Sequence, residues 1–356
     1  MHTPGFRRLR RAGWPARADG PGPRGQQLRA ARAGTPGGRA VMTARSARIL
    51  AAAAGLAAAA PAGLAAALIN AAIVRKPPVS DETADDSDLV AATTAAAQRQ
   101  GRAWMAATPH QRWTVTAHDG TRLAGYYFPA PRPAHRTVIL IHGHRADASL
   151  MGNFARDYRA RGFNVFMADN RAHGDSGGCY VGMGWLDHFD YLRWISRLVG
   201  TVGPDAGIVL HGISMGGATA LLLSGSPDLP PQVRAVISDC SFSSAYAEFA
   251  YHLRARHLPA RLILPLASQM CRILAGYRIT QASPLDAIAR AAIPVLLIHG
   301  GADTYNPTAM AHELHAAQPH ADLWIVPGAD HVMSYFTDPG AYRKRVDQFL
   351  RHLPQA

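Results

Sequence analysis

In the last two thirds of the chain, short apolar runs alternate with longer segments of helical periodicity. Short runs rich in valine, isoleucine and leucine are typical of strands that are buried on both faces of a parallel sheet. The runs that we interpret as such strands cover 137–141, 164–168, 207–210, 235–238, 293–298 and 323–326. Strands that alternate with helices predict an α/β fold, in which helices cover both faces of a mostly parallel sheet.

Two further runs, 113–117 and 123–128, flank an Asp-Gly dipeptide at 119–120. This arrangement predicts a β-hairpin at the start of the folded domain. Helical patterns predict helices over 89–107, 150–161, 185–199, 307–317 and 340–353. We therefore place one folded domain at 109–356, after a linker and a short helix at 75–108.

About 40 residues, from about 241 to 283, break this alternation of strands and helices. Their spacing predicts two or three helices, which we interpret as a small cap on the sheet. The segment is rich in aromatic and apolar side chains, among them Tyr246, Phe249 and Met270. We expect these side chains to form an apolar wall for a substrate. Ordinary packing of a helix on the sheet is the alternative for about half of such side chains.

Ser214 lies in the sequence Gly-Ile-Ser-Met-Gly, between an apolar run and a helix-like segment. A serine on such a strand-to-helix turn is the nucleophile elbow of the G-x-S-x-G pattern. Gly212 and Gly216 fit the pattern because a side chain at either position would crowd the strained turn. We interpret Ser214 as a nucleophile; an ordinary turn with a solvated serine is the alternative.

Two partners for Ser214 follow later in the chain. Asp303 comes just after the apolar run at 293–298, and His331 comes after the run at 323–326. The order Ser, Asp, His is one of the known orders of a hydrolytic triad. A histidine can take and return a proton near neutral pH, and a carboxylate can orient its ring. Asp239 and Asp330 compete with Asp303 for this role, and we favour Asp303 on position.

A developing oxyanion requires preorganised backbone donors. We assign one donor to the amide of Met215, directly after the proposed nucleophile, and the other to the amide of His144, in the loop after 137–141. The His144 side chain either points at substrate or is exposed. We expect no metal, because no His, Asp or Glu cluster has a compact ligand spacing, and no cofactor, because no dinucleotide turn is present.

These motifs together resemble the α/β-hydrolase superfamily, in particular the membrane-anchored bacterial hydrolases often labelled serine aminopeptidase-like or esterase-like. The resemblance covers about 113–353. The matching segments are His142-Gly143, DNRAHGDSGG at 169–178, GISMGG at 212–217, SDCSF at 238–242, SPL at 283–285, 294–303 and GADH at 328–331. The resemblance implies an α/β-hydrolase fold with a cap. It also implies that segment 169–178 is structural, with its Arg and Asp hydrogen-bonded inside the segment.

The formal net charge of +13 is concentrated at the N-terminus. Residues 1–48 contain eleven arginines and one acid, whereas basic and acidic residues nearly balance over 49–356. We expect this Arg-rich tail to be disordered, and we expect no nucleic-acid partner. Met42 precedes an apolar stretch and is an alternative to Met1 as the first residue of the protein. Binding of nucleic acid by the tail is the competing hypothesis.

No charged residue occurs from Ile49 to Val74. As a helix this segment would be about 39 Å long, which is enough to cross a hydrocarbon core of about 30 Å. We interpret 49–74 as a transmembrane signal anchor; a cleaved signal peptide and a soluble Ala-rich helix are the alternatives. The arginines before residue 49 predict a single-pass protein with its catalytic domain outside the cytoplasm.

The sequence thus predicts a membrane-tethered serine hydrolase that cleaves carboxylic esters, with thioesters or amides as other bond classes. We expect a small-molecule ester or a lipid-like substrate. The competing hypothesis is a catalytically silent member of the same fold, which acts as a binding or scaffold protein at the membrane.

Overall fold

The computed structural model of this 356-residue protein describes residues 59–77 and 89–353. The tail expected over 1–48, the first ten residues of the anchor expected over 49–74 and most of the linker before residue 89 lie outside the described residues.

An eight-stranded sheet forms the centre of the domain, in the order β1-β2-β4-β3-β5-β6-β7-β8. The strands are β1 (Gln111–Thr116), β2 (Arg122–Phe128), β3 (Arg136–Ile141), β4 (Asn164–Ala168), β5 (Gly207–Ile213), β6 (Val233–Asp239), β7 (Val295–Gly300) and β8 (Asp322–Val326). β1 and β2 pair antiparallel, as the hairpin pattern predicts, β2 pairs antiparallel with β4, and the pairs from β4 to β8 are parallel. β7 begins two residues later than predicted, because Pro294 has no N–H for a ladder bond.

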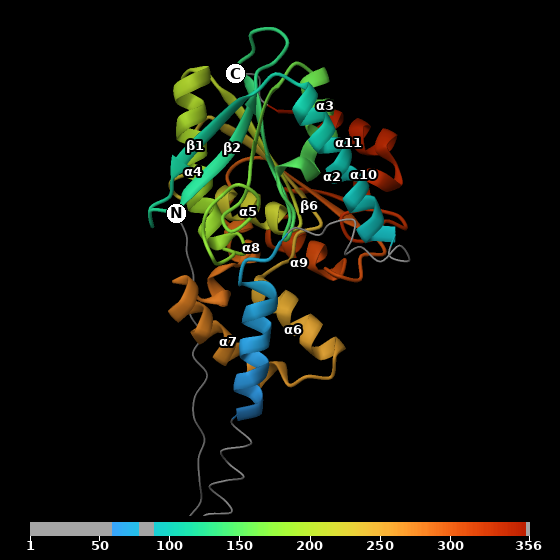
Figure 1. Cartoon of the computed structure of the whole chain (residues 1–356). Helices are drawn as coiled ribbons and strands as arrows, with labels where there is room; N and C mark the ends of the chain where they lie inside the picture. The colour runs from blue at the N-terminus through green and yellow to red at the C-terminus, as the bar shows by residue number, and fades with distance from the viewer. Residues whose placement is uncertain (1–58, 78–88, 354–356) are drawn as a thin grey trace, which may run out of the picture. The chain divides into compact units, whose positions relative to one another are not determined.

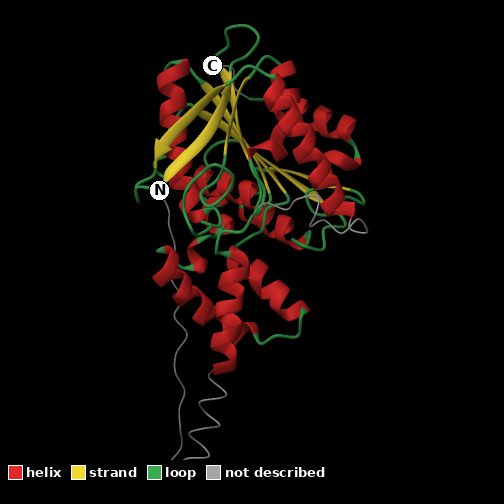
Figure 2. Ribbon diagram, viewed as in Figure 1, coloured by secondary structure: helices red, strands yellow, loops and turns green. Residues whose placement is uncertain are grey.

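Helices cover both faces of this sheet, which confirms the predicted α/β fold (Figure 2). One face packs against α4 (Trp185–Val202), α5 (Met215–Ser224), α8 (Pro284–Ile288) and α9 (Ala309–Ala317). The other face packs against α2 (Leu89–Ala107), the 3₁₀ helix η1 (Ala148–Met151), α3 (Gly152–Ala160), α10 (Ser334–Thr337) and α11 (Pro339–Arg351). The strands read as continuous apolar runs because both of their faces are buried.

The segment predicted to be a cap forms α6 (Ala245–Ala255), α7 (Ala260–Ala275) and the 3₁₀ helix η2 (Ile279–Gln281). The Ser244 side chain begins α6 by accepting a hydrogen bond from the Ala247 amide, at 3.1 Å. α6 and α7 bury their facing sides in a separate apolar cluster, to which Phe249, Ile263 and Leu264 belong. This cluster also contains Met215 and Ala218 of α5, so the cap packs onto the main domain through it.

Residues 59–72, in the second half of the predicted anchor, form a helix whose Ala65, Ile69 and Ile73 side is buried. These three side chains belong to the same apolar cluster as α6 and α7, and Figure 1 shows this helix beside both of them. Within the described ranges, no helix has both the length and the apolar character needed to cross a bilayer.

The end of this helix is fixed to the segment at 174–181. The guanidinium of Arg75 donates hydrogen bonds to the carbonyls of Ser176 at 2.6 Å and Gly174 at 2.7 Å. The Val181 amide donates to the carbonyl of Ile73 at 2.7 Å. These contacts join the helix to the edge of the sheet that carries the proposed active site.

Segment 169–178 is structural in a way that differs in part from the expectation. Asp169 bonds within the segment, since it accepts from the Asp175 amide at 2.8 Å. Arg171 instead reaches outside the segment: its Nε and Nη2 donate to both carboxylate oxygens of Asp190 on α4, each at 2.8 Å, and its Nη1 donates to Asp119. The guanidinium thus joins the hairpin, the segment and α4.

Replacing Arg171 by glutamine should lower the free energy of unfolding by about 3–5 kcal/mol, because it leaves a buried carboxylate without its partner. The side chains of Arg171 and Asp190 are only 4% and 3% exposed. Urea unfolding of the two proteins measures the difference.

Arg112→Gln is the matched control, because Arg112 and Asp175 pair with 52% and 55% of their side chains exposed. An exposed pair of this kind should contribute at most about 1 kcal/mol. Equal destabilisation by the two variants would contradict the importance that we assign to burial of the Arg171–Asp190 pair.

Candidate active site

Ser214 lies on the sharp turn between β5 and α5, with φ 55° and ψ −121°. This left-handed conformation is strained for a residue with a side chain and is typical of a nucleophile elbow. The turn closes tightly: a Cβ at Gly212 would collide with the carbonyl of Gly216, and a Cβ at Gly216 would collide with the carbonyl of Ile141. The Ser214 amide donates to the Asp239 carbonyl at 2.8 Å, which holds the turn against β6.

His331, in the loop after β8, lies within hydrogen-bond distance of Ser214. Its Nε2 is 3.0 Å from the Ser214 hydroxyl, and its Nδ1 is 2.8 Å from Oδ2 of Asp303. A neutral ring with its proton on Nδ1 satisfies both contacts: Nδ1–H donates to the carboxylate, and Nε2 accepts from the hydroxyl. The structure therefore brings Ser214, Asp303 and His331 together from three loops at one edge of the sheet.

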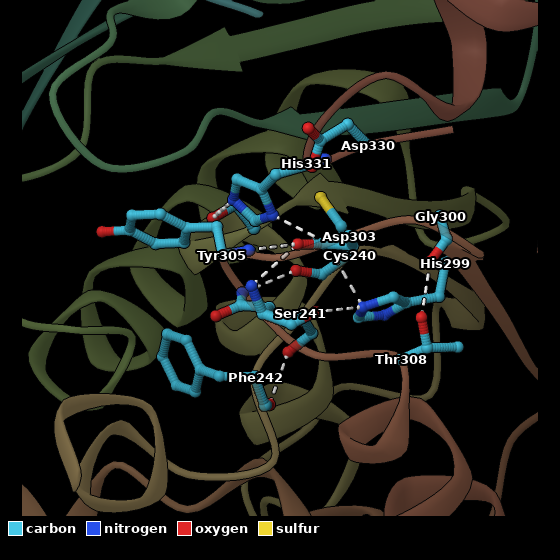
Figure 3. A network of polar contacts seen from close by, with 12 residues as sticks. Cys240, Ser241, Phe242, His299, Gly300, Asp303, Tyr305, Thr308, Asp330 and His331 are labelled. Carbon is cyan, nitrogen blue, oxygen red and sulfur yellow. Dashed lines mark hydrogen bonds and ion pairs between the residues drawn. The ribbon is translucent and has the colours of Figure 1, made fainter. Parts of the chain in front are cut away.

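Asp303, after β7, is held by several donors (Figure 3). The amides of Tyr305 and Asn306 donate to its Oδ1 at 2.9 and 2.8 Å, while Oδ2 faces His331. Burial alone would raise its pKa, but hydrogen bonds from His299 and His331 outweigh burial and lower the pKa of Asp303 to about 2. The group is therefore a carboxylate at neutral pH.

His299 is the site residue that sequence reasoning missed. Its Nε2 lies 3.3 Å from Oδ2 of Asp303 and 2.8 Å from the carbonyl of Asn306, and the residue is buried. Although burial lowers the pKa of His299, the hydrogen bond with Asp303 raises it above its ordinary value. The carboxylate thus lies between two imidazoles. The sequence signal that could have pointed to His299 is its position at the end of the strand that leads to Asp303.

The two competing carboxylates have other partners. Asp239 is buried, where its Oδ1 accepts from the Ser334 hydroxyl at 2.9 Å and its Oδ2 accepts from Tyr342 on α11 at 3.0 Å. Burial raises the pKa of Asp239 to about 6. Asp330 accepts from the backbone amide of His331 at 2.7 Å and so shapes the loop. Asp303 is the carboxylate that contacts the His331 ring.

The two residues predicted to supply oxyanion donors lie on segments that contact or adjoin Ser214. Met215 is the first residue of α5, and the first amides of a helix have no acceptor inside it. In the other loop, a Cβ at Gly143 would lie 3.3 Å from Cβ of Ser214, so this loop touches the serine just before His144. The His144 side chain follows neither expectation: its Nε2 contacts the carbonyl of Ala72, at 3.0 Å. Burial lowers the pKa of His144 to about 4, so the ring is neutral.

The predicted pocket residues lie in the apolar cluster of the cap. Phe249 is buried, and Tyr246 and Met270 are partly buried against the same cluster, which also contains Met215. Their side chains therefore contribute to packing of the cap, and Met215 connects that cluster to the proposed nucleophile.

Tyr305, in the loop after β7, and two polar residues of α6 lie near the triad and were not singled out from sequence. The Tyr305 ring stacks on His331 at 4.8 Å between centroids, and the His252 ring lies 4.4 Å from Tyr305. Glu248, one turn before His252 on α6, is buried, and its Oε2 has no hydrogen-bond partner among the described residues. Burial, and to a smaller extent the negative charge of Asp303, raises the pKa of Glu248 to about 8.

Among the described residues, Cys240, Asp303 and His331 bring possible metal-ligand atoms within 4.8 Å of one another. Burial raises the pKa of the Cys240 thiol well above its ordinary value, whereas a metal ligand would need the thiolate. Asp303 and His331 already bond to each other. We therefore assign no metal to this group.

Comparison with known proteins identifies the family of the chain. Residues 138–345 match the alpha/beta hydrolase family. The chain is 33% identical over 244 residues to the uncharacterized protein YqkD of Bacillus subtilis, covering 68% of this chain and 79% of that protein. It is 32% identical over 243 residues to the uncharacterized protein YfhR of Escherichia coli K12, covering 66% and 78%.

Solved structures show the same fold. The Pyrococcus furiosus esterase Pf2001 superposes with a TM-score of 0.56 at 21% identity, covering 69% of this chain and 91% of the esterase. The alpha/beta hydrolase GrgF from a Penicillium species superposes with a TM-score of 0.54 at 18% identity, covering 69% and 99%. With its elbow, its sheet order and these matches, the chain belongs to the alpha/beta hydrolase family.

Proposed function

We propose that the protein is a membrane-tethered serine hydrolase that cleaves carboxylic esters through an acyl-enzyme. The observation that carries this proposal is the unbroken series of contacts from the Ser214 hydroxyl through the His331 ring to the Asp303 carboxylate, at 3.0 and 2.8 Å. Family membership and the likeness in fold to an esterase support hydrolase activity in general.

In the first half of the reaction, the Ser214 oxygen attacks the ester carbonyl while its proton moves to Nε2 of His331. Asp303 stabilises the imidazolium that forms. The amides of Met215 and His144 donate to the oxyanion of the tetrahedral intermediate. The C–O bond to the alcohol then breaks, and His331 returns the proton to the leaving alcohol.

In the second half, His331 takes a proton from water, which attacks the acyl carbonyl of the acyl-serine. The carboxylic acid leaves as the C–O bond to Ser214 breaks, and the serine recovers its proton. Tyr246, Phe249 and Met270 of the cap supply an apolar side for the acyl group in this proposal. The chemistry uses no cofactor.

In this proposal the tether is the uncharged segment at 49–74, whose described half packs on the cap. The arginines before it support an orientation with the catalytic domain outside the cytoplasm. The described part of that segment ends against the loop of His144, which supports a role for it close to the active site.

A fluorophosphonate probe tests the nucleophile directly. We expect the full-length protein to be labelled, and mass spectrometry of the digested adduct to place the phosphonate on Ser214, alongside turnover of p-nitrophenyl esters. Comparison of matched ester, thioester and anilide substrates then gives the bond class. An adduct on another serine, or a folded protein that neither labels nor turns over any ester, would overturn the proposal in favour of a binding role.

A further inference from the structure

The cap presents an apolar stripe to its surroundings. On α7 the side chains of Leu262, Leu266 and Ile273 are 59%, 40% and 72% exposed, and Leu274 nearby is 47% exposed. At about 100° per residue, the first three lie within roughly 40° of one another on the helix. The opposite side of α7 packs into the cap cluster. Several large apolar side chains exposed on one helix are typical of a surface that binds a partner or a membrane.

The exposed charges of the cap are basic. The cap residues 245–281 contain Arg254, Arg256, Arg261, Arg272 and Arg278, all exposed, and one acid, Glu248, which is buried. Around the axis of α7, Arg261 and Arg272 lie to one side of the stripe. Leucine and isoleucine next to arginine, without exposed acids, are typical of surfaces that enter the headgroup region of an anionic bilayer. We call the stripe and these five arginines the cap face.

The sequence next to the cap face favours a bilayer over a soluble partner. The helix at 59–72 packs beside α6 and α7, and its exposed residues are alanine, glycine and asparagine. The chain that enters this helix is uncharged from Ile49 onward. Residues 49–58 of this stretch precede the described helix, and residues 59–74 pack against protein. The described structure thus begins with a helix that packs against α7, the element that carries the exposed apolar side chains.

The cap also contacts residues next to the triad. The Tyr251 hydroxyl of α6 donates to the carbonyl of Thr304 at 3.2 Å, and the ring of His252 lies against Tyr305, which stacks on His331. Tyr305 is itself 46% exposed. The cap therefore packs, through α6, against the loop that carries Asp303 and Tyr305.

We propose that the cap face rests on an anionic phospholipid bilayer and that the substrate is an acyl ester of an amphiphile taken from that bilayer. The inference about the substrate rests on the proposed function, whereas the docking itself does not. Leu262, Leu266 and Ile273 enter the acyl region, and the arginines meet phosphate oxygens. In this proposal the ester passes from the bilayer to Ser214 beside Tyr305, the residue that contacts both α6 and His331.

A fluorescent label on the cap face tests the docking. Cys179 is the exposed cysteine of the described residues, while Cys240 and Cys271 are buried, so Cys179→Ser gives a background for selective labelling. In it, Ile273→Cys carries an environment-sensitive dye. Asp205→Cys, an exposed position just before β5 at the opposite edge of the sheet, is the matched control.

The full-length protein is then placed in vesicles of phosphatidylcholine with phosphatidylglycerol. We expect the dye at 273 to shift to the blue and to be quenched by lipids that carry a quencher in the acyl chain, with a weaker effect in phosphatidylcholine alone. The dye at 205 should show neither change. An unshifted dye at 273 would overturn the docking. So would light scattering that shows a dimer which Ile273→Ser dissociates, since a second copy would then cover the stripe.

Turnover tests the substrate. The double variant Leu262→Ser, Ile273→Ser should hydrolyse an acyl ester embedded in these vesicles at least about tenfold more slowly, because it loses apolar contact with the bilayer. It should hydrolyse a short, water-soluble ester at the unchanged rate. Leu89→Ser, at an exposed leucine on α2, is the control substitution. Equal turnover of the embedded ester by all three proteins would overturn the inference about substrate, whereas no turnover of any ester would count against the proposed function instead.

Discussion

Replacing Ser214 by alanine is expected to lower kcat for ester hydrolysis by about 10⁴- to 10⁶-fold. The loss should be this large because the attacking oxygen is removed, while the oxyanion donors and the binding contacts remain and give only residual rate enhancement. The hydrogen bond from the Ser214 backbone amide to the Asp239 carbonyl does not involve the serine side chain, so the variant should keep the fold. Steady-state kinetics with a soluble ester, together with circular dichroism, measures both effects.

Ser224→Ala is the matched control for this variant. Ser224 is also buried, at the other end of α5, where its hydroxyl donates to the carbonyl of Leu221 at 2.7 Å. It has no contact with His331, so its replacement should change kcat by less than about twofold. Retention of most of the activity by Ser214→Ala would exclude Ser214 as the nucleophile and favour a water molecule or another side chain in its place.

Replacing Asp303 by asparagine is expected to lower kcat by about 10⁴-fold. The amide has no negative charge to stabilise the imidazolium, and its NH₂ group can turn toward His331 and favour the tautomer with its proton on Nε2. That tautomer cannot accept the serine proton. The effect should appear in kcat more than in KM, because the lost interaction strengthens as the charge develops on His331.

Asp239→Asn separates the two buried carboxylates. It removes the charge of a group that contacts Ser334 and Tyr342 and not the His331 ring, so it should keep kcat within about tenfold and mainly lower stability. A loss of activity in Asp239→Asn as large as that in Asp303→Asn would contradict the assignment of Asp303.

The pKa of Asp303 also predicts how stability varies with pH. The folded protein holds this pKa at about 2, below the ordinary value of 3.8. Its contribution to stability, on the order of 2 kcal/mol, is therefore present above about pH 4 and is lost as pH falls toward 2. In Asp303→Asn, acid unfolding should be less steep in this range, and chemical unfolding at a series of pH values measures the slope.

The order of the site along the chain could be predicted from sequence because each side chain follows a recognisable strand. Ser214 follows β5, Asp303 follows β7 and His331 follows β8, and parallel strands place such ends at one edge of the sheet. The strands themselves were visible because burial on both faces leaves continuous apolar runs.

Contacts between side chains that are far apart in the sequence could not be predicted. Nothing near His299 in the sequence shows that its ring reaches the same oxygen as His331, since this depends on rotamers and on the loop at 303–306. Similarly, the partners of Arg171 come from the hairpin and from α4, far apart in sequence. The helix at 59–72 has an apolar pattern that suits a bilayer and a protein surface equally, so its packing on the cap had no distinct sequence signal.

The contact between His144 and the carbonyl of Ala72 connects the N-terminal helix to the loop that carries a proposed oxyanion donor. Arg75 also donates hydrogen bonds to the carbonyls of Ser176 and Gly174. Together these contacts fix the helix to the edge of the sheet that carries the proposed active site. A chain shortened to begin at Pro77 would keep the triad and the sheet, but its His144 ring would lose that acceptor. The position of the N-terminal helix therefore bears on the geometry of the loop that carries His144.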